Sequence, residues 1–183
     1  MQKIPLDLAT RTINCGPVLI IGTKGKNYDD FSAVAWNMPL NKEPSKVAIC
    51  VGPSHQTWTN IEQYGKFSCN IPGLDLIPHL AYFGGVSGKD TDKLKESSVE
   101  LFKPDELPVP ALKKALAVLI CEVIEMDKET HIITAEVTLA FAKGEYFSDH
   151  WTGKEGVFPV NHLGGPNYQC GGKLVNQSKL KSW

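Results

Sequence analysis

The chain has 183 residues, a length that suits one domain with a well-formed core. Its 19 basic and 20 acidic side chains give a net charge of −1, so general attraction to nucleic acid or to an anionic membrane is not predicted. No apolar stretch reaches the roughly 18 residues that would cross a bilayer, so no membrane span is expected.

Cysteine usage indicates the redox setting. The five cysteines form no Cys-x-x-Cys pair, so they predict neither a disulfide framework nor a zinc site. Cys50, Cys69 and Cys121 lie in apolar runs and are expected to be small buried hydrophobes. Residues 1–7 lack the apolar core of a secretory signal, so we expect a cytoplasmic protein with a single domain over residues 1–183.

The first half of the chain is typical of short strands separated by turns. Apolar runs predict strands over 17–23, 31–36 and 46–52. The polar turn at 25–30 allows the first two strands to form a hairpin, while the proline-bounded segment 39–44 is expected to break the chain.

A helix is predicted after the third strand. Apolar residues recur at three-residue steps over 58–64, and Thr59 with Glu62 has the spacing of a capping box. Gly65 is the expected stop, and a strand over 67–71 follows it.

The second half contains the longest predicted strands. After a short helix over 74–83, interrupted near its proline, comes a glycine-rich charged loop over 84–93. Strands over 117–125 and 131–143 are then predicted to pair as a hairpin through a turn at 127–130. Many short strands with a few brief helices predict a mainly β fold, a closed or nearly closed barrel, since a doubly wound sheet would need alternating longer helices.

The segment 87–93, Ser-Gly-Lys-Asp-Thr-Asp-Lys, carries the most informative pattern. Gly88 would let the backbone approach a ligand closely, and Lys89 and Lys93 add positive charge, so the segment is a candidate phosphate cradle. A solvated turn that enters a helix and is capped by one of its own polar residues is the alternative, and the spacing alone favours it.

Three further segments have both a ligand-binding and a purely structural interpretation. Segment 52–57 joins a strand to a helix, and its hydroxyls could hold an anion or only cap the helix. Segment 35–38, Ala-Trp-Asn-Met, could hydrogen-bond to the edge of a planar ring through its backbone and amide groups, or it could place a tryptophan in the core. His162 and Tyr168 flank a flexible turn and could stack on a ring or lie in a surface loop.

Several other chemistries find no support in the sequence. It contains no P-loop, no G-x-G-x-x-G dinucleotide fingerprint, no G-x-S-x-G elbow and no H-E-x-x-H zinc helix. The histidines lack metal-ligand spacing, so no metal site is predicted.

Taken in order, these segments resemble the flavin reductase and flavoredoxin branch of the FMN-binding split-barrel family. The resemblance runs from about Pro17 to Tyr168 and is carried by residues 31–36, 44–52, 55–61, 67–72, 86–93 and 162–165, with Tyr168. The order of the motifs is more specific than any single one. One departure is Gly84-Gly85, where many relatives have Cys-Gly.

The resemblance implies a six-stranded antiparallel split β-barrel with a few short helices, usually a homodimer with FMN near the subunit interface. It also implies that the FMN carries the redox chemistry, so that no catalytic acid or base is required. The residues it implies for FMN binding are Ala35, Trp36, Asn37, Met38, Val51, Gly52, Ser54, His55, Thr57, Asn70, Ser87, Gly88, Lys89, Lys93, His162 and Tyr168.

The implied function is that of an FMN-dependent oxidoreductase of the NAD(P)H:flavin type. Electrons would come from NADH or NADPH, or from a protein donor such as ferredoxin, and pass to flavin, ferric complexes or a partner protein. A bound nicotinamide is expected to stack on the exposed flavin face, because the chain has no Rossmann unit. The alternatives are a non-enzymatic flavoredoxin-type electron carrier with tightly bound FMN, and a barrel that has lost its flavin.

Overall fold

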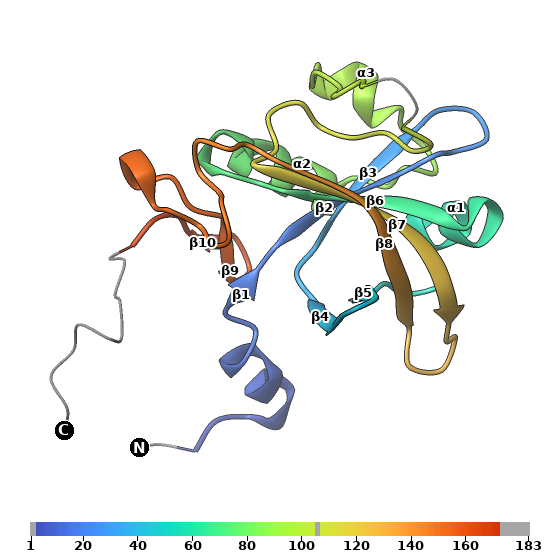
Figure 1. Cartoon of the computed structure of the whole chain (residues 1–183). Coiled ribbons are helices and arrows are strands. Elements are labelled where there is room, and N and C mark those ends of the chain that lie inside the picture. The colour runs from blue at the N-terminus through green and yellow to red at the C-terminus, as the bar shows by residue number, and fades with distance from the viewer. Residues whose placement is uncertain (1–2, 105–106, 173–183) are drawn as a thin grey trace, which may run out of the picture.

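The computed structural model describes residues 3–104 and 107–172 and contains two antiparallel sheets. The main sheet has seven strands in the order β3 (Asp30–Val34), β2 (Leu19–Thr23), β6 (Lys66–Ile71), β7 (Ala117–Met126), β8 (Ile132–Ala142), β5 (Ser45–Cys50) and β4 (Asn37–Lys42) (Figure 1). The smaller sheet has three strands, β1 (Gly16–Pro17), β9 (Asn161–Gly164) and β10 (Asn167–Gln169).

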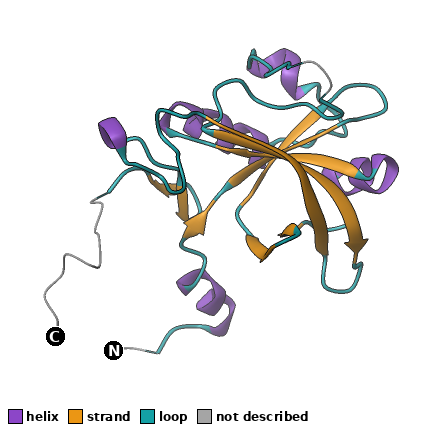
Figure 2. Cartoon of the chain, viewed as in Figure 1, coloured by secondary structure: helices purple, strands orange, loops and turns teal. Residues whose placement is uncertain are grey.

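The main sheet curls into a split barrel because of how its two edges are connected. β3 and β4 occupy opposite ends of the strand order, yet only Ala35 and Trp36 lie between them in the chain. The sheet must therefore bend so that the end of β3 comes near the start of β4, and Figure 2 shows that its long strands are strongly curved. Within the described residues β3 and β4 do not pair, so the barrel stays open along this line, which we call the seam.

The predicted fold class is confirmed, with one more strand in the main sheet than the six expected. The additional strand is β4, so the expected chain break over residues 39–44 is wrong. β4 pairs with β5 on one side only, and Pro39 lies opposite Val47 in that ladder. An edge strand tolerates proline because one row of its backbone groups makes no ladder hydrogen bonds.

Short helices connect and cover the strands. They are η1 (Leu6–Thr12), α1 (Gln56–Tyr64), η2 (Leu74–Leu76), α2 (Ile77–Gly85), α3 (Lys93–Ser97) and η3 (Lys154–Gly156). In the part of the chain that the structure describes, no helix is long and apolar enough to cross a membrane.

The predicted ends of the helices were right in part. α1 begins at Gln56 with His55 as its N-cap, so the expected capping box is wrong and Thr59 lies inside the helix. Gly65 ends the helix as predicted, in the left-handed conformation at φ 66°. The helix expected over 74–83 is interrupted near Pro78 as predicted, since it divides into η2 and α2, and Pro78 occupies the first turn of α2, where the missing amide hydrogen is not needed.

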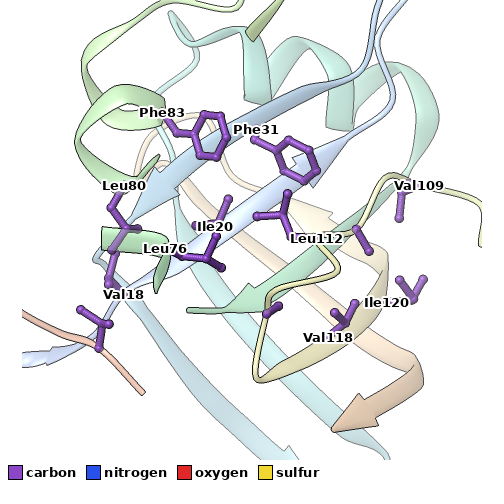
Figure 3. Packing of buried hydrophobic residues seen from close by; sticks show 13 residues of the cluster. Val18, Ile20, Phe31, Leu76, Leu80, Phe83, Val109, Leu112, Val118 and Ile120 are labelled. Atoms are coloured by element: carbon purple, nitrogen blue, oxygen red, sulfur yellow. The ribbon is translucent and has the colours of Figure 1, made fainter. Parts of the chain in front are cut away.

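Two apolar cores fix α1 and α2 to the sheet. Phe83 and Leu80 of α2 pack on Phe31 of β3, and the rings of Phe31 and Phe83 are 5.6 Å apart (Figure 3). Trp58 and Ile61 of α1 pack into the second core. Complete burial of side chains of this size stabilises a fold by about 1.5–3 kcal/mol each, so the loops at the ends of both helices are held close to β3.

The expectation of three buried cysteines is confirmed for two of them. Cys69 and Cys121 are fully buried in the second core on the paired strands β6 and β7, with their Sγ atoms 3.9 Å apart. Cys50 is only half-buried, because it lies at the end of β5 where the core gives way to a cavity.

Candidate functional site

A cavity of about 470 Å³ opens at the seam, and we call it the seam cavity. Its wall consists of the link between β3 and β4, the end of β5, and the segment that follows η1. The lining residues are Thr10, Ile13, Asn14, Gly16, Pro17, Ala35, Trp36, Asn37, Met38, Ala48, Ile49, Cys50 and Ile132. A mostly apolar wall with a few amide groups, and a volume within the usual range of about 300–1,000 Å³, suit a planar organic ligand.

Asn37 holds the seam cavity in shape. Its Nδ2 donates to the carbonyl oxygen of Pro17 at 2.8 Å and to those of Val34 and Ala35 at 3.3 Å. The amide of Cys50 donates to the carbonyl oxygen of Trp36 at 2.9 Å. These bonds tie β1, the seam and β5 together, so the walls are set before any ligand arrives.

A second cavity of about 230 Å³ lies between the start of α1 and the loop after α2, and we call it the loop cavity. Its lining residues are Asp30, Ser32, Ala33, Ser54, His55, Gln56, Thr57, Phe83, Gly84, Gly85, Val86, Ser87, Gly88 and Lys93. The amide of Trp58 donates to the carbonyl oxygen of His55 at 3.1 Å, but the first two amides of α1, those of Gln56 and Thr57, have no acceptor within the helix, and among the described residues no side chain caps them. With the Ser54 and Thr57 hydroxyls, they form a set of donors suited to an anion.

A buried ion pair forms one side of the loop cavity. Lys93 Nζ lies 3.0 Å from Asp30 Oδ1, and both side chains are almost wholly buried. Burial raises the pKa of Asp30, although the charge of Lys93 and the hydrogen bond from the Phe31 amide both act to lower it. The ammonium also donates to the carbonyl oxygens of Phe31 at 2.6 Å and Phe83 at 3.5 Å, whereas Asp30 Oδ1 has no hydrogen-bond partner among the described residues and contacts Lys93 only as an ion pair.

Gly88 is required by the ion pair. A β-carbon at this position would lie 2.5 Å from Cγ and Oδ1 of Asp30, closer than real contacts allow. The glycine of the Ser-Gly-Lys segment therefore allows the loop to approach a carboxylate of the protein itself. Asp92, the residue before α3, accepts a hydrogen bond from the amide of Lys95 and caps that helix.

The two cavities are lined by the same two segments of chain. Residues 32–38 line the loop cavity with Ser32 and Ala33 and the seam cavity from Ala35 onward. Residues 48–57 do the same, lining the seam cavity up to Cys50 and the loop cavity from Ser54 onward. The two cavities therefore lie at successive positions along the same two segments.

The structure brings together most of the residues that the sequence suggested. Ala35, Trp36, Asn37 and Met38 line the seam cavity. Ser54, His55, Thr57, Ser87, Gly88 and Lys93 line the loop cavity. Val51 and Gly52 line neither cavity but connect the two groups along the chain, and Lys89 is exposed outside both.

Asn70 lies in the interior of the sheet, and both polar atoms of its side chain are hydrogen-bonded within the protein. Its Nδ2 donates to the Ile20 carbonyl oxygen and to Ser68 Oγ, and its Oδ1 accepts from the amide of Leu112 at 2.7 Å. The side chain is fully buried, so its role here is to join β6 to β2 and to the chain before β7.

His162 and Tyr168 face each other in the small sheet, outside both cavities as the described residues define them. The two residues are paired across β9 and β10, with ring centroids 5.4 Å apart. His162 is also paired with Gly16, which lines the seam cavity, so the small sheet supports that cavity from behind.

Sequence reasoning missed several lining residues. Asp30 is the most important of them, because it forms the ion pair with Lys93, and its only signal in the sequence is a charge just before an apolar run. Thr10, Ile13 and Asn14 were missed too, since they lie in or just after a short 3₁₀ helix with no motif.

Comparison with solved structures defines the class of fold. The chain is similar to an FMN-binding domain of a flavin reductases-like enzyme from Shewanella baltica OS155, with a TM-score of 0.81 and 24% identity over 94% of this chain and 95% of that one. It is similar to flavoredoxin of Desulfovibrio vulgaris (Miyazaki F), with a TM-score of 0.84 and 19% identity over 97% and 98% of the two chains. The fold is therefore the split barrel of these proteins.

Sequence comparison gives the family. A model of the flavin reductase like domain matches residues 11–149. The uncharacterized protein YddH of Escherichia coli (strain K12) is 31% identical over 184 residues, which cover 94% of this chain and 96% of YddH. The chain belongs to the flavin reductase-like domain family.

Proposed function

We propose that the chain binds FMN along the seam and acts as a flavin-dependent oxidoreductase. The observation that carries this proposal is that an apolar cavity and a donor-lined cavity share the same two segments of chain. FMN has the matching shape, a planar apolar ring joined by a short polar chain to a phosphate.

In this proposal the loop cavity takes the phosphate. The uncapped amides at the start of α1 and the hydroxyls of Ser54 and Thr57 donate to its oxygens. The seam cavity takes the ring, with Trp36 and Met38 at its mouth and Asn37 keeping the walls in place. FMN itself supplies hydride and electron transfer, and the chain supplies binding, orientation and exclusion of water.

Thr57 offers a direct test of the phosphate end. Replacing Thr57 by Val removes a hydroxyl that lines the loop cavity while keeping the shape of the side chain. We expect FMN binding to weaken by about 1.5–3 kcal/mol, the usual contribution of a hydrogen bond to a charged group. Fluorescence titration with FMN measures this. Thr59→Val, on the exposed side of α1, is the matched control and should bind like the parent protein.

The redox role is tested by stopped-flow reduction of the FMN-loaded protein with NADH and NADPH. Rapid reduction by either supports an NAD(P)H-dependent reductase that passes electrons to free flavin, ferric complexes or a partner protein. Tight FMN, negligible reduction by nicotinamides and fast exchange with reduced ferredoxin would support the electron carrier instead. Failure to bind FMN would exclude both.

We further propose a homodimer formed through β4. This edge strand is almost wholly exposed, and Trp36, Met38 and Leu40 together present apolar side chains 55%, 54% and 42% exposed. Unpaired strand edges and contiguous apolar surface are both features that a protein partner usually covers. A second copy here would also close the mouth of the seam cavity over the ring.

A reducing, cytoplasmic compartment fits this proposal. Within the described residues all five cysteines are free thiols. Disulfides form and persist mainly in oxidising compartments, so free thiols are the usual state in the cytosol.

A further inference from the structure

The charges that line the loop cavity come from one pair of residues. Asp30 and Lys93 carry opposite charges and lie 3.0 Å apart, and His55 is the only other titratable side chain among the described residues lining this cavity. Lys89, the other cation of the loop, is exposed outside the cavity. Asp30 and Lys93 cancel, so apart from His55 the wall of the cavity carries no net charge.

The Lys93 ammonium is not free to approach a ligand unless it leaves its present partners. It contacts Asp30 Oδ1 and donates to the carbonyl oxygens of Phe31 and Phe83. It is 2% exposed, and the close approach of Gly88 covers the Asp30 carboxylate. An anion that enters the cavity therefore meets a cation whose field is largely cancelled by the carboxylate beside it.

We propose that Asp30 determines the affinity and specificity of the phosphate end of the site, by holding Lys93 in a neutral pair. The inference rests on the proposed function. The neutral amides and hydroxyls then hold the phosphate, and the cavity gains little from the double negative charge of FMN. FMN is consequently an exchangeable ligand, and the site discriminates only weakly between FMN and riboflavin, which lacks the phosphate.

Four proteins that differ in the charge of the cavity test this inference. Asp30→Asn keeps the shape of the side chain and gives a wall charge of +1, and Lys93→Met gives −1. The parent protein and the double variant Asp30→Asn/Lys93→Met both have a neutral wall. The measured quantity is the ratio of riboflavin and FMN dissociation constants, obtained by fluorescence titration after each variant is checked for folding by circular dichroism.

The ratio of the riboflavin dissociation constant to the FMN dissociation constant should rise as the charge of the cavity wall becomes more positive. We expect Asp30→Asn to bind FMN about tenfold more tightly or better, and Lys93→Met about tenfold more weakly, with riboflavin changing less than about twofold in each. The double variant should return to the parent ratio. If both single variants lower the preference for FMN, or if the ratio stays unchanged in both, the two residues only support the loop and the inference is wrong.

Two features keep the test decisive. If a single variant fails to fold, the salt dependence of the parent protein replaces it. A neutral wall predicts that FMN affinity changes less than about threefold between roughly 0.05 and 0.5 M NaCl, and a steeper fall would overturn the inference. If neither flavin binds any of the four proteins, the proposed function itself fails, which is a different result from binding with an unchanged ratio.

Discussion

At the scale of single residues, the Asp30–Lys93 pair is the feature with the largest energetic consequences. Two buried charges gain from each other but lose their hydration, so the pair itself stabilises the fold little, whereas removing one partner leaves the other buried and unpaired. Since burial raises the pKa of Asp30 above 3.8, the folded chain binds its proton more tightly than the unfolded chain does. The stability from this group is therefore fully present below pH 3.8 and is lost as the pH rises through the folded-state pKa.

Gly88 provides a test of the close packing over this pair. In Gly88→Ala the new methyl group would lie 2.5 Å from the Asp30 carboxylate, which is buried and paired with Lys93. We expect the free energy of unfolding to fall by about 1–3 kcal/mol, the usual cost of overpacking, measured by urea denaturation. Gly85→Ala is the matched control, because a β-carbon there meets no atom within 4 Å. Equal stability of the two variants would contradict the packing argument.

At the scale of elements, the β7–β8 hairpin shows how a local sequence sets the register. The turn over residues 127–130 is confirmed, and Asp127 organises it. The Asp127 carboxylate accepts a hydrogen bond from Thr130 Oγ1 at 2.8 Å and others from the amides of Glu129 and Thr130. These bonds, the Thr130 hydroxyl first among them, lower the pKa of Asp127 below 3.8.

The lowered pKa makes the stability of this turn dependent on pH. The contribution of the Asp127 charge is present above pH 3.8 and is lost as the pH falls through the folded-state pKa. Asp127→Asn keeps an acceptor oxygen but removes the charge. We expect it to be less stable than the parent near neutral pH, with the difference shrinking below pH 3.8 and in high salt, because the turn is exposed. Thermal unfolding across pH measures this, and a difference independent of pH would contradict it.

Much of this level of structure could be predicted from the sequence. The hairpins, the stop at Gly65 and the barrel class follow from local patterns of apolar, glycine and turn residues. β4 could not be predicted, since a proline within a short polar segment is typical of a break, and only pairing with β5 makes it a strand. The start of α1 was misplaced because the motif at Thr59 has no role once Trp58 and Ile61 pack in the core.

The candidate site was predictable only where its residues are contiguous. Segments 35–38 and 52–57 are recognisable as strand and helix ends with polar groups, and the fold brings them to one seam. The partnership of Asp30 with Lys93 joins residues far apart in the chain, so no spacing rule predicts it. For the same reason Lys93 looks in the sequence like a free cation for phosphate, whereas in the fold its charge is already paired.

At the scale of the whole molecule, the exposed face of β4 is the surface through which the proposed dimer would form. Leu40 lies on this strand but outside the seam cavity, so changing it should affect assembly without altering the walls of the site. The mass in solution decides whether the proposed dimer exists, because one chain has a mass of 20.1 kDa.

A charged residue at Leu40 should prevent the proposed dimer. Leu40→Glu buries a carboxylate at the interface, and we expect light scattering to show a fall from twice 20.1 kDa to 20.1 kDa. FMN affinity should also be lower in Leu40→Glu if the second copy closes the seam cavity in the dimer. Leu74→Glu, at an exposed apolar position on η2, is the control and should remain dimeric. A parent protein that is monomeric would rule out the interface.

The two-residue link between β3 and β4 has a consequence for the entropy of ligand binding. Strands that line different parts of a site usually come from distant parts of a chain, and closing the long loop between them costs free energy that grows with its length. Here Ala35 and Trp36 join β3, which lines the loop cavity, directly to β4, which lines the seam cavity. A ligand that binds along this seam would therefore meet a surface that is already assembled. Little of its interaction energy would be offset by the cost of ordering the chain, so it would dissociate more slowly.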